Sequence, residues 1–184
     1  LLEELRLVAV ETNEVWAKKL GIPVSAAITC VKPSGTVSQL VDSGSGIHAR
    51  HAPYYIRTVR ADKKDPLAKM MADIGFPVED DVMKAAHTCV FSFPVKVSPD
   101  AVFRKDLNAI EQLELWLVYQ RHWAEHKPSI TVSVKEEEWM EVGAWVFEHF
   151  DEMSGVSFLP FSDHIYRQAP YQDCTEEQYE ALLA

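Results

Sequence analysis

The sequence has only three cysteines, Cys30, Cys89 and Cys174, and they lie far apart. No two of them form a Cys-x-x-Cys pair, so the pattern indicates neither a cysteine-rich zinc site nor a disulfide framework. An odd, scattered set in a cytosolic chain is typical of buried thiols. We expect Cys30 and Cys89, which lie in apolar runs, to be inert core residues, and Cys174, among polar residues, to be exposed.

Long apolar runs and excess positive charge are also missing. No run approaches the ~20 apolar residues that span a bilayer, and no basic-then-apolar leader opens the sequence. With 18 Lys+Arg against 28 Asp+Glu, the net charge of −10 argues against a nucleic-acid surface. A single nucleotide is not excluded, because a few backbone amides can hold phosphates. These patterns predict a cytoplasmic protein with neither a membrane nor a nucleic acid as partner.

What is present is the composition of an ordinary globular protein, 47% hydrophobic and 25% charged over 184 residues. That length is enough for one hydrophobic core. The first residues, 1–5, already read as helix interior, and the last helix, over 175–183, has no Gly or Pro terminator. We therefore expect the chain to be a piece of something longer.

Apolar periodicity predicts strands and helices in alternation. The expected strands cover residues 24–31, 54–59, 88–97, 130–134 and 156–159. The expected helices cover residues 1–20, 36–41, 65–74, 107–126, 137–150 and 175–183. Alternation of this kind favours an α/β fold, either a barrel or a doubly wound sheet, over α+β.

The strongest local signal is the run Ile28-Thr29-Cys30-Val31-Lys32-Pro33-Ser34-Gly35-Thr36-Val37-Ser38, in which a strand, a turn and a helix are expected to follow each other. The first turn of a helix leaves amides without partners and carries partial positive charge, which suits an anion. Gly35 permits close approach of a phosphate, and Ser34 and Thr36 add hydroxyls. Spacing alone slightly favours an ordinary strand–helix connection with a Ser/Thr cap, and the Walker pattern is absent.

Three blocks in this order resemble a known family. They are Thr29-Cys30-Val31-Lys32-Pro33-Ser34-Gly35-Thr36-Val37-Ser38, residues 46–60 (GIHARHAPYYIRTVR), and residues 157–164 (SFLPFSDH) with 166–171 (YRQAPY). The sequence is similar to the adenosylcobalamin-dependent (class II) ribonucleotide reductases over nearly its whole length, and closest to the monomeric ribonucleoside-triphosphate reductases.

The resemblance implies that residues 1–184 form the carboxy-terminal part of a ten-stranded α/β barrel, an incomplete domain. The family's turn grips the substrate phosphates, and the matching positions here are Pro33, Ser34, Gly35, Thr36 and Val37. It further implies ribonucleoside triphosphates as substrate, adenosylcobalamin as cofactor and thioredoxin as reductant of the full-length enzyme. Part of the family's cobalamin-contacting surface is expected within residues 46–60.

The family's reactive centre is missing from this sequence. The resemblance implies a thiyl-radical cysteine in an Asn-x-Cys-x-Glu signature, with further cysteines that supply electrons by forming a disulfide. None of the three cysteines here has that context. We therefore predict no catalytic residue in this chain, and no activity from it alone.

Several other residue types admit a functional interpretation beside a structural one. His122 and His126 are four apart, a spacing that can bind zinc, but no third ligand is evident and a solvated face is favoured. His48 and His51 could contact nucleotide or cofactor, although ordinary loop positions are favoured. Tyr54-Tyr55 is similar to the radical-relaying tyrosine pair of class I reductases, but that pair belongs much nearer the carboxy terminus.

Two other hypotheses remain open on the sequence. The chain could belong to the large subunit of a class I ribonucleoside-diphosphate reductase, which a carboxy-terminal tyrosine pair and cobalamin-independent activity would favour. It could also be a non-catalytic nucleotide-binding or regulatory module, which a natural start codon just before Leu1 and cooperative folding of the isolated chain would favour.

Overall fold

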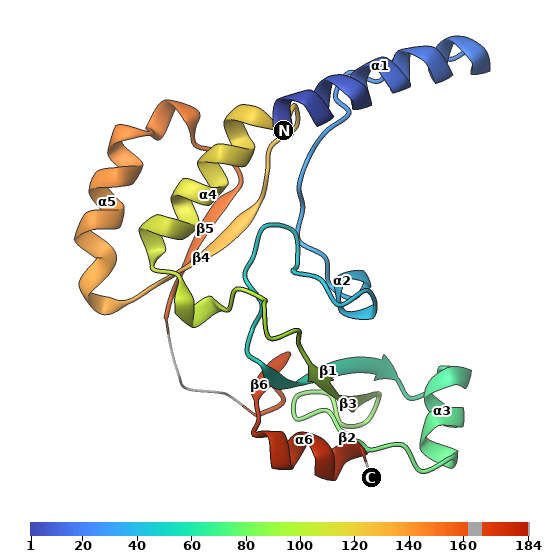
Figure 1. The fold of residues 1–184 in the computed structure, drawn as a ribbon. Coiled ribbons are helices and arrows are strands. Elements are labelled where there is room, and N and C mark those ends of the chain that lie inside the picture. Colours follow the sequence, from blue (N-terminus) through green and yellow to red (C-terminus); the bar gives the residue numbers. More distant parts are fainter. Residues whose placement is uncertain (162–166, 184) are drawn as a thin grey trace. The chain divides into compact units, whose positions relative to one another are not determined.

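The chain divides into two compact units in the computed structural model, which describes residues 1–161 and 167–183 (Figure 1). Unit 1 comprises residues 1–49 and 104–161, and unit 2 comprises 50–103 and 162–184. The third block of the family resemblance is thus only partly visible, because Ser162, Asp163, His164 and Tyr166 lie outside the described residues. Each unit is built around its own sheet.

Unit 1 contains a parallel pair of strands with helices packed on it. Ile130 of β4 lies opposite Val156 of β5, and helix α5 provides the crossover between the two strands. The buried core joins Leu113 and Trp116 of α4 with Val132 of β4 and residues of α5. The elements are α1 (Leu2–Leu20), α2 (Val37–Leu40), α4 (Ala109–His122), β4 (Ile130–Val134), α5 (Trp139–Glu148) and β5 (Val156–Pro160), with 3₁₀ turns at 104–106, 136–138 and 150–152.

Helix α4 begins where its capping residues dictate. The Asn108 side chain accepts a hydrogen bond from the Glu111 amide, and the Glu111 carboxylate accepts one from the Asn108 amide, both at 2.8 Å. The predicted helix over 107–126 is therefore shorter at its start, and it ends at His122. Trp116 is fully buried, and its indole nitrogen donates to the Pro128 carbonyl at 3.3 Å, which fixes the turn before β4.

Unit 2 is a four-stranded antiparallel sheet in the order β2-β3-β1-β6. Asp65 caps α3 by accepting from the Leu67 amide at 2.8 Å, with Pro66 in the first helical position. Pro94 fits inside β3 because it lies beyond the residues that pair with β2. The elements are β1 (Tyr54–Asp62), α3 (Pro66–Asp73), β2 (Val78–Asp80), β3 (Thr88–Lys96), β6 (Tyr171–Asp173) and α6 (Glu176–Leu183).

The combination of helices and strands confirms the predicted α/β class, and most predicted elements are present. The antiparallel sheet of unit 2 was not predicted by the alternation. Strands β2 and β6, with three residues each, are too short to show a periodicity in the sequence. Helix α5 starts at Trp139, because residues 136–138 form a 3₁₀ turn instead.

The predicted strand over 24–31 is wrong: this segment is irregular and mostly exposed. The Thr29 carbonyl accepts from the amides of Glu125 and His126, and the Val31 carbonyl accepts from the Ser129 amide. The segment is therefore held by the connection between α4 and β4 rather than by a continuous ladder. Cys30 is correspondingly exposed, against the expectation of a core residue, while Cys89 is buried as predicted and Cys174 is half-buried.

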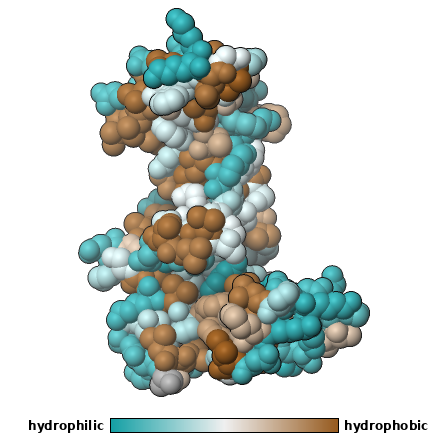
Figure 2. All heavy atoms as spheres, turned by 90° about the vertical axis from the view of Figure 1, so that its right-hand side faces the viewer, coloured by the Kyte–Doolittle hydropathy of each residue, from teal (hydrophilic) through white to brown (hydrophobic). Residues whose placement is uncertain are grey.

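Large apolar side chains are exposed on several elements, and Figure 2 shows hydrophobic surface interspersed with hydrophilic surface. On α1 the helically spaced residues Leu5, Val8, Val15 and Trp16 are about half exposed, and only Ala17 is buried. Within the described residues no helix is both long and apolar enough to cross a membrane.

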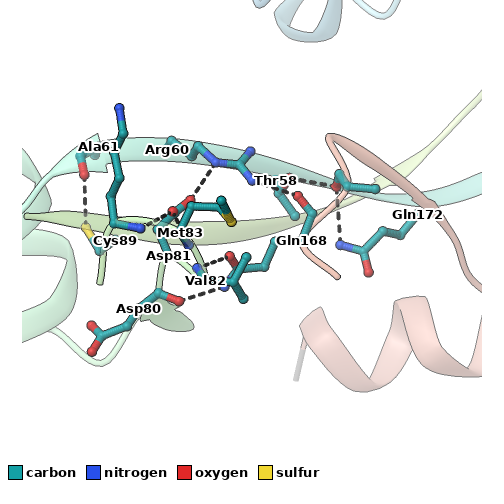
Figure 3. A network of polar contacts seen from close by, with 12 residues as sticks. Thr58, Arg60, Ala61, Asp80, Asp81, Val82, Met83, Cys89, Gln168 and Gln172 are labelled. Atoms are coloured by element: carbon teal, nitrogen blue, oxygen red, sulfur yellow. Dashed lines mark hydrogen bonds and ion pairs between the residues drawn. The ribbon is translucent and has the colours of Figure 1, made fainter. Parts of the chain in front are cut away.

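A polar network joins β1 to the residues beside β2 and to the segment before β6 (Figure 3). Arg60 donates to the Asp81 carboxylate at 2.7 Å and to the Gln168 carbonyl at 3.0 Å. Asp81 also accepts from the amides of Met83 and Lys84, each at 2.9 Å. The Gln168 side chain accepts from the Val82 amide at 2.9 Å. Three distant parts of the sequence, residue 60, residues 81–84 and residue 168, are thereby fixed to one another in unit 2.

We expect the stability of unit 2 to fall in acid through Asp81. The Arg60 hydrogen bond, followed by that of the Met83 amide, lowers the pKa of the Asp81 carboxyl below its ordinary value. A lowered pKa means that the stabilisation is complete above about pH 4 and is lost as the pH falls through the lowered value. Asp81→Asn should therefore lower the melting temperature at pH 7, and this difference should narrow at pH 3.

The matched control is Asp80→Asn, because the Asp80 side chain is 65% exposed and pairs with Lys63 at the surface. Thermal unfolding of the full-length protein at the two pH values measures both variants. An equal loss of stability at pH 7 and pH 3 in Asp81→Asn would contradict the role of its ionised form.

Candidate functional site

The segment that precedes the Pro-Ser-Gly-Thr turn is anchored to the end of α4. The Thr29 side chain is buried, and its hydroxyl donates to the Trp123 carbonyl at 2.5 Å. The Glu125 carboxylate accepts from the amides of Ile28, at 2.9 Å, and Thr29, at 3.3 Å, and these two bonds lower the pKa of Glu125. The turn therefore starts from a fixed point on unit 1.

Ser34 and Ser45 clamp the turn closed. The Ser34 amide donates to the Ser45 hydroxyl oxygen at 2.8 Å, and that hydroxyl donates to the Ser34 carbonyl at 2.9 Å. The Ser34 hydroxyl oxygen in turn accepts from the Ser38 amide at 3.0 Å. Ser34 rather than Thr36 thus supplies the side-chain cap of α2, since Thr36 makes no cap hydrogen bond. The Ser34 amide is occupied within the chain.

The donors that remain in the turn belong to Thr36 and Val37. In the part of the chain that the structure describes, neither their amides nor the Thr36 hydroxyl has a hydrogen-bond partner. Both residues are exposed. Because α2 spans only four residues, its dipole is small, and any attraction for an anion rests mainly on these individual donors.

Gly35 lies at a position where the chain itself does not require glycine. A Cβ atom built there meets nothing within 4 Å, and the backbone is not left-handed. Gly46 differs, because its φ is +64° and a Cβ atom would lie 2.8 Å from the Lys32 carbonyl oxygen. Gly46 is explained by the close passage of the two ends of the loop, whereas Gly35 borders open space.

The far end of the loop is fastened to the core of unit 1. Ile47 is buried in the cluster that α4, α5 and β4 share. His48 lies between the loop and β4, with Nδ1 2.7 Å from the Ser45 carbonyl and Nε2 accepting from the Thr131 amide at 2.9 Å. Lys32 donates to the Ser129 hydroxyl at 2.9 Å. Sequence reasoning missed Ser45, because a serine between two glycines is typical of a flexible loop.

Several polar side chains of residues 50–60 have partners within unit 2. Arg50 is buried and lies 3.4 Å from the Tyr55 hydroxyl. His51 stacks on Tyr171 with ring centroids 5.2 Å apart, and its Nε2 lies 2.6 Å from an Asp173 carboxylate oxygen. The Arg57 guanidinium lies over the Tyr171 ring at 4.4 Å. These contacts give His51 and Arg57 structural partners within their own unit.

His122, the last residue of α4, and His126, in the segment after α4, have separate hydrogen-bond partners. His122 Nδ1 lies 2.9 Å from the Glu3 carboxylate, and His126 Nδ1 accepts from the Lys127 amide at 2.9 Å. Across residues 1–161 and 167–183 no group of three or more His, Cys, Asp or Glu side chains is arranged to hold a metal ion.

Comparison with known proteins connects this chain to an enzyme family. A probable adenosylcobalamin-dependent ribonucleoside-triphosphate reductase from Dictyostelium discoideum is 32% identical over 180 residues, 95% of this chain and 23% of the relative. The adenosylcobalamin-dependent ribonucleoside-triphosphate reductase of Euglena gracilis is 32% identical over 89% of this chain and 23% of the relative. No family model matches the chain.

A solved structure agrees with these relatives. The crystal structure of a B12-dependent (class II) ribonucleotide reductase matches 99% of this chain and 26% of its own, with a TM-score of 0.81 and 27% identity. The chain belongs to the adenosylcobalamin-dependent (class II) ribonucleotide reductase family. This reductase segment spans about a quarter of the length of the curated relatives it matches. Its α/β fold is consistent with part of the reductase barrel, as the resemblance implied.

Proposed function

We propose that the full-length protein reduces ribonucleoside triphosphates to deoxyribonucleotides with adenosylcobalamin, and that thioredoxin restores its dithiol. The relatives that carry this activity in their names align with 89–95% of the chain at 32% identity. In the proposed reaction the 2′-hydroxyl of the ribose leaves as water, while two thiols are oxidised to a disulfide. Adenosylcobalamin, when bound to the full-length protein, supplies the radical that starts this chemistry.

The share of this chain in the reaction is to hold the substrate phosphates at the turn formed by Pro33, Ser34, Gly35, Thr36 and Val37. The observation that carries this proposal is the set of donors on Thr36 and Val37, exposed and without partners among the described residues, beside a glycine that borders open space. Backbone amides are suited to phosphate because they hold it without the desolvation of a side-chain charge. Ser34 shapes the turn instead, since its amide is already bonded to Ser45.

The chain supplies no catalytic residue in this proposal. Cys30 is exposed, Cys89 is buried and donates weakly to the Ala61 carbonyl, and burial followed by the Asp173 charge raises the pKa of the Cys174 thiol. A raised pKa disfavours the thiolate, so Cys174 is not an activated nucleophile. The reactive cysteines are accordingly assigned to other parts of the full-length protein.

Several polar side chains in the segment after the loop already have partners within the chain. Both ring nitrogens of His48 lie against backbone groups, His51 lies against Asp173, and Arg57 and Arg60 donate to backbone carbonyls of residues 168–170. We therefore assign the cofactor to the full-length protein, and a contact of part of residues 46–60 with it stays a prediction from the family resemblance.

The test is turnover by the full-length protein. We expect deoxyribonucleotide formation from a ribonucleoside triphosphate to require adenosylcobalamin and a dithiol, and the 184-residue chain alone to give no product. Activity that ignores cobalamin and needs a partner radical protein would instead support a class I enzyme. Nucleotide binding without turnover under all of these conditions would support a non-catalytic module, and turnover by the isolated chain would contradict the absence of catalytic residues.

A further inference from the structure

Strand β4 has an edge opposite β5 where backbone donors need partners. Alternate residues of a strand direct their amides to the same edge, and Ile130 already donates toward β5, to the Gly155 carbonyl. The amides of Ser129, Thr131 and Ser133 point to the other edge of β4, away from β5. Ser129 donates to the Val31 carbonyl, Thr131 to His48 Nε2, and Ser133 to the Gln112 side chain at 3.4 Å. His48 thus stands where a neighbouring strand would supply a carbonyl.

The two contacts of the His48 ring define its tautomer. The Thr131 amide can only donate, so Nε2 must be the acceptor and carries no proton. The Ser45 carbonyl can only accept, so the proton resides on Nδ1. The ring is therefore neutral and saturated with hydrogen bonds, which leaves it no polar atom for a nucleotide.

A continuous chain of hydrogen bonds leads from β4 to the turn. It runs from the Thr131 amide through the His48 ring to the Ser45 carbonyl, and from the Ser45 hydroxyl to both the amide and the carbonyl of Ser34. The His48 amide adds a second bond to the Ser45 carbonyl at 3.2 Å. Ser34 is adjacent to Gly35, and its hydroxyl oxygen accepts a hydrogen bond from the Ser38 amide. The hydrogen bonds of Ser34 therefore fix the backbone on both sides of Gly35.

We propose that His48 and Ser45 are positioning residues that hold the phosphate-binding turn at a fixed position relative to β4. This inference rests on the proposed function of the turn. The two residues do not touch the phosphates; they set where the amides of Thr36 and Val37 point. Preorganised donors bind an anion more tightly than mobile donors because their ordering precedes binding.

The experiment measures KM and kcat of the full-length protein for a ribonucleoside triphosphate, and the inhibition constant of inorganic triphosphate. We expect His48→Ala and Ser45→Ala each to raise KM and the inhibition constant about five- to tenfold, with kcat changed less than about twofold. The double variant should be little worse than either single one, because both act through the same link. Ser45→Thr, which keeps the hydroxyl, should restore KM.

A control separates positioning from general loss of stability. Val142 is buried in the same core, on α5 and outside the hydrogen-bond chain, so Val142→Ala should lower the melting temperature without raising KM. If KM rises as much in Val142→Ala as in His48→Ala at equal loss of stability, the positioning role is wrong. Should His48→Ala fail to fold, Ser45→Ala carries the test alone.

The outcomes also distinguish this inference from the proposed function. If Gly35→Val raises KM but His48→Ala and Ser45→Ala do not, the turn binds phosphate and only the positioning role is overturned. If Gly35→Val leaves KM unchanged, the phosphate-binding role of the turn itself is lost. Strict additivity of His48→Ala and Ser45→Ala would show that they act separately and would overturn the link between them.

Discussion

Gly35→Val is expected to raise the KM of the full-length protein for its ribonucleoside triphosphate at least about tenfold, while its melting temperature stays nearly unchanged. The fold tolerates the change because a Cβ atom at Gly35 meets nothing within 4 Å, and the backbone there suits any residue. The valine side chain occupies space beside the donors of Thr36 and Val37. A bound phosphate would be displaced from those donors, so binding weakens without damage to the chain.

Gly143→Val is the matched control for this prediction. Gly143 also has nothing within 4 Å of a built Cβ atom and has no left-handed backbone, but it lies in α5, away from the turn. We expect the KM of this variant to equal that of the wild type. Gly35→Ala should give an intermediate KM, and steady-state kinetics of the three variants, with thermal unfolding of each, measures the series. A Gly35→Val enzyme with wild-type KM would remove the turn from substrate binding.

The largest effect on stability is expected from Gly155→Ala, which we predict to destabilise the β4–β5 pair by about 3 kcal/mol or more. Gly155 has a φ of +55°, where an alanine is strained by about 1–2 kcal/mol. In addition, a Cβ atom there would overlap with the Pro128 carbonyl oxygen, which is backbone and cannot rotate away. Relief requires separation of the two strands at the Ile130 amide, which donates to the Gly155 carbonyl.

Hydrogen exchange of the Ile130 amide in the full-length protein measures this effect at the site. Gly75→Ala is the control, because Gly75 has a φ of +85° but nothing within 4 Å of its Cβ position. It should show the backbone strain alone, about 1–2 kcal/mol, measured at the Gly75 and Phe76 amides that end α3. Equal losses in the two variants would mean that the contact with the Pro128 carbonyl is relieved at no cost.

Local sequence signals predicted elements well where they were strong and uninterrupted. The strand over 130–134 agrees with the structure at both ends, and Asp65-Pro66 with Gly75 marked α3 to within a residue. The strand predicted over residues 24–31 is not present, because β-branched and apolar residues favour a strand only when a partner strand is available. The sequence pattern indicates the strand propensity of the segment, but it does not indicate which backbone groups lie beside the segment in the folded chain.

The candidate site shows the same division. The Pro-Ser-Gly-Thr turn over residues 33–37 and the family were identifiable from the sequence, because the motif is contiguous and the relatives match nearly the whole chain. The roles within the turn were not. The Ser34 amide is hydrogen-bonded to the Ser45 hydroxyl, which leaves the donors of Thr36 and Val37 as the ones without a partner among the described residues. The His48 ring accepts a hydrogen bond from the Thr131 amide of β4.

The sequence by itself determined the α/β class, the family, the start of α3 and the position of the turn, since each depends on neighbouring residues or on a contiguous motif. Only the tertiary structure decided which side chains fasten the turn, which glycines the chain itself needs, and that Arg60, Asp81 and Gln168 meet. The reason is physical. Hydrogen bonds between residues 83 or 108 positions apart depend on how the chain folds back on itself, and no local pattern records that path.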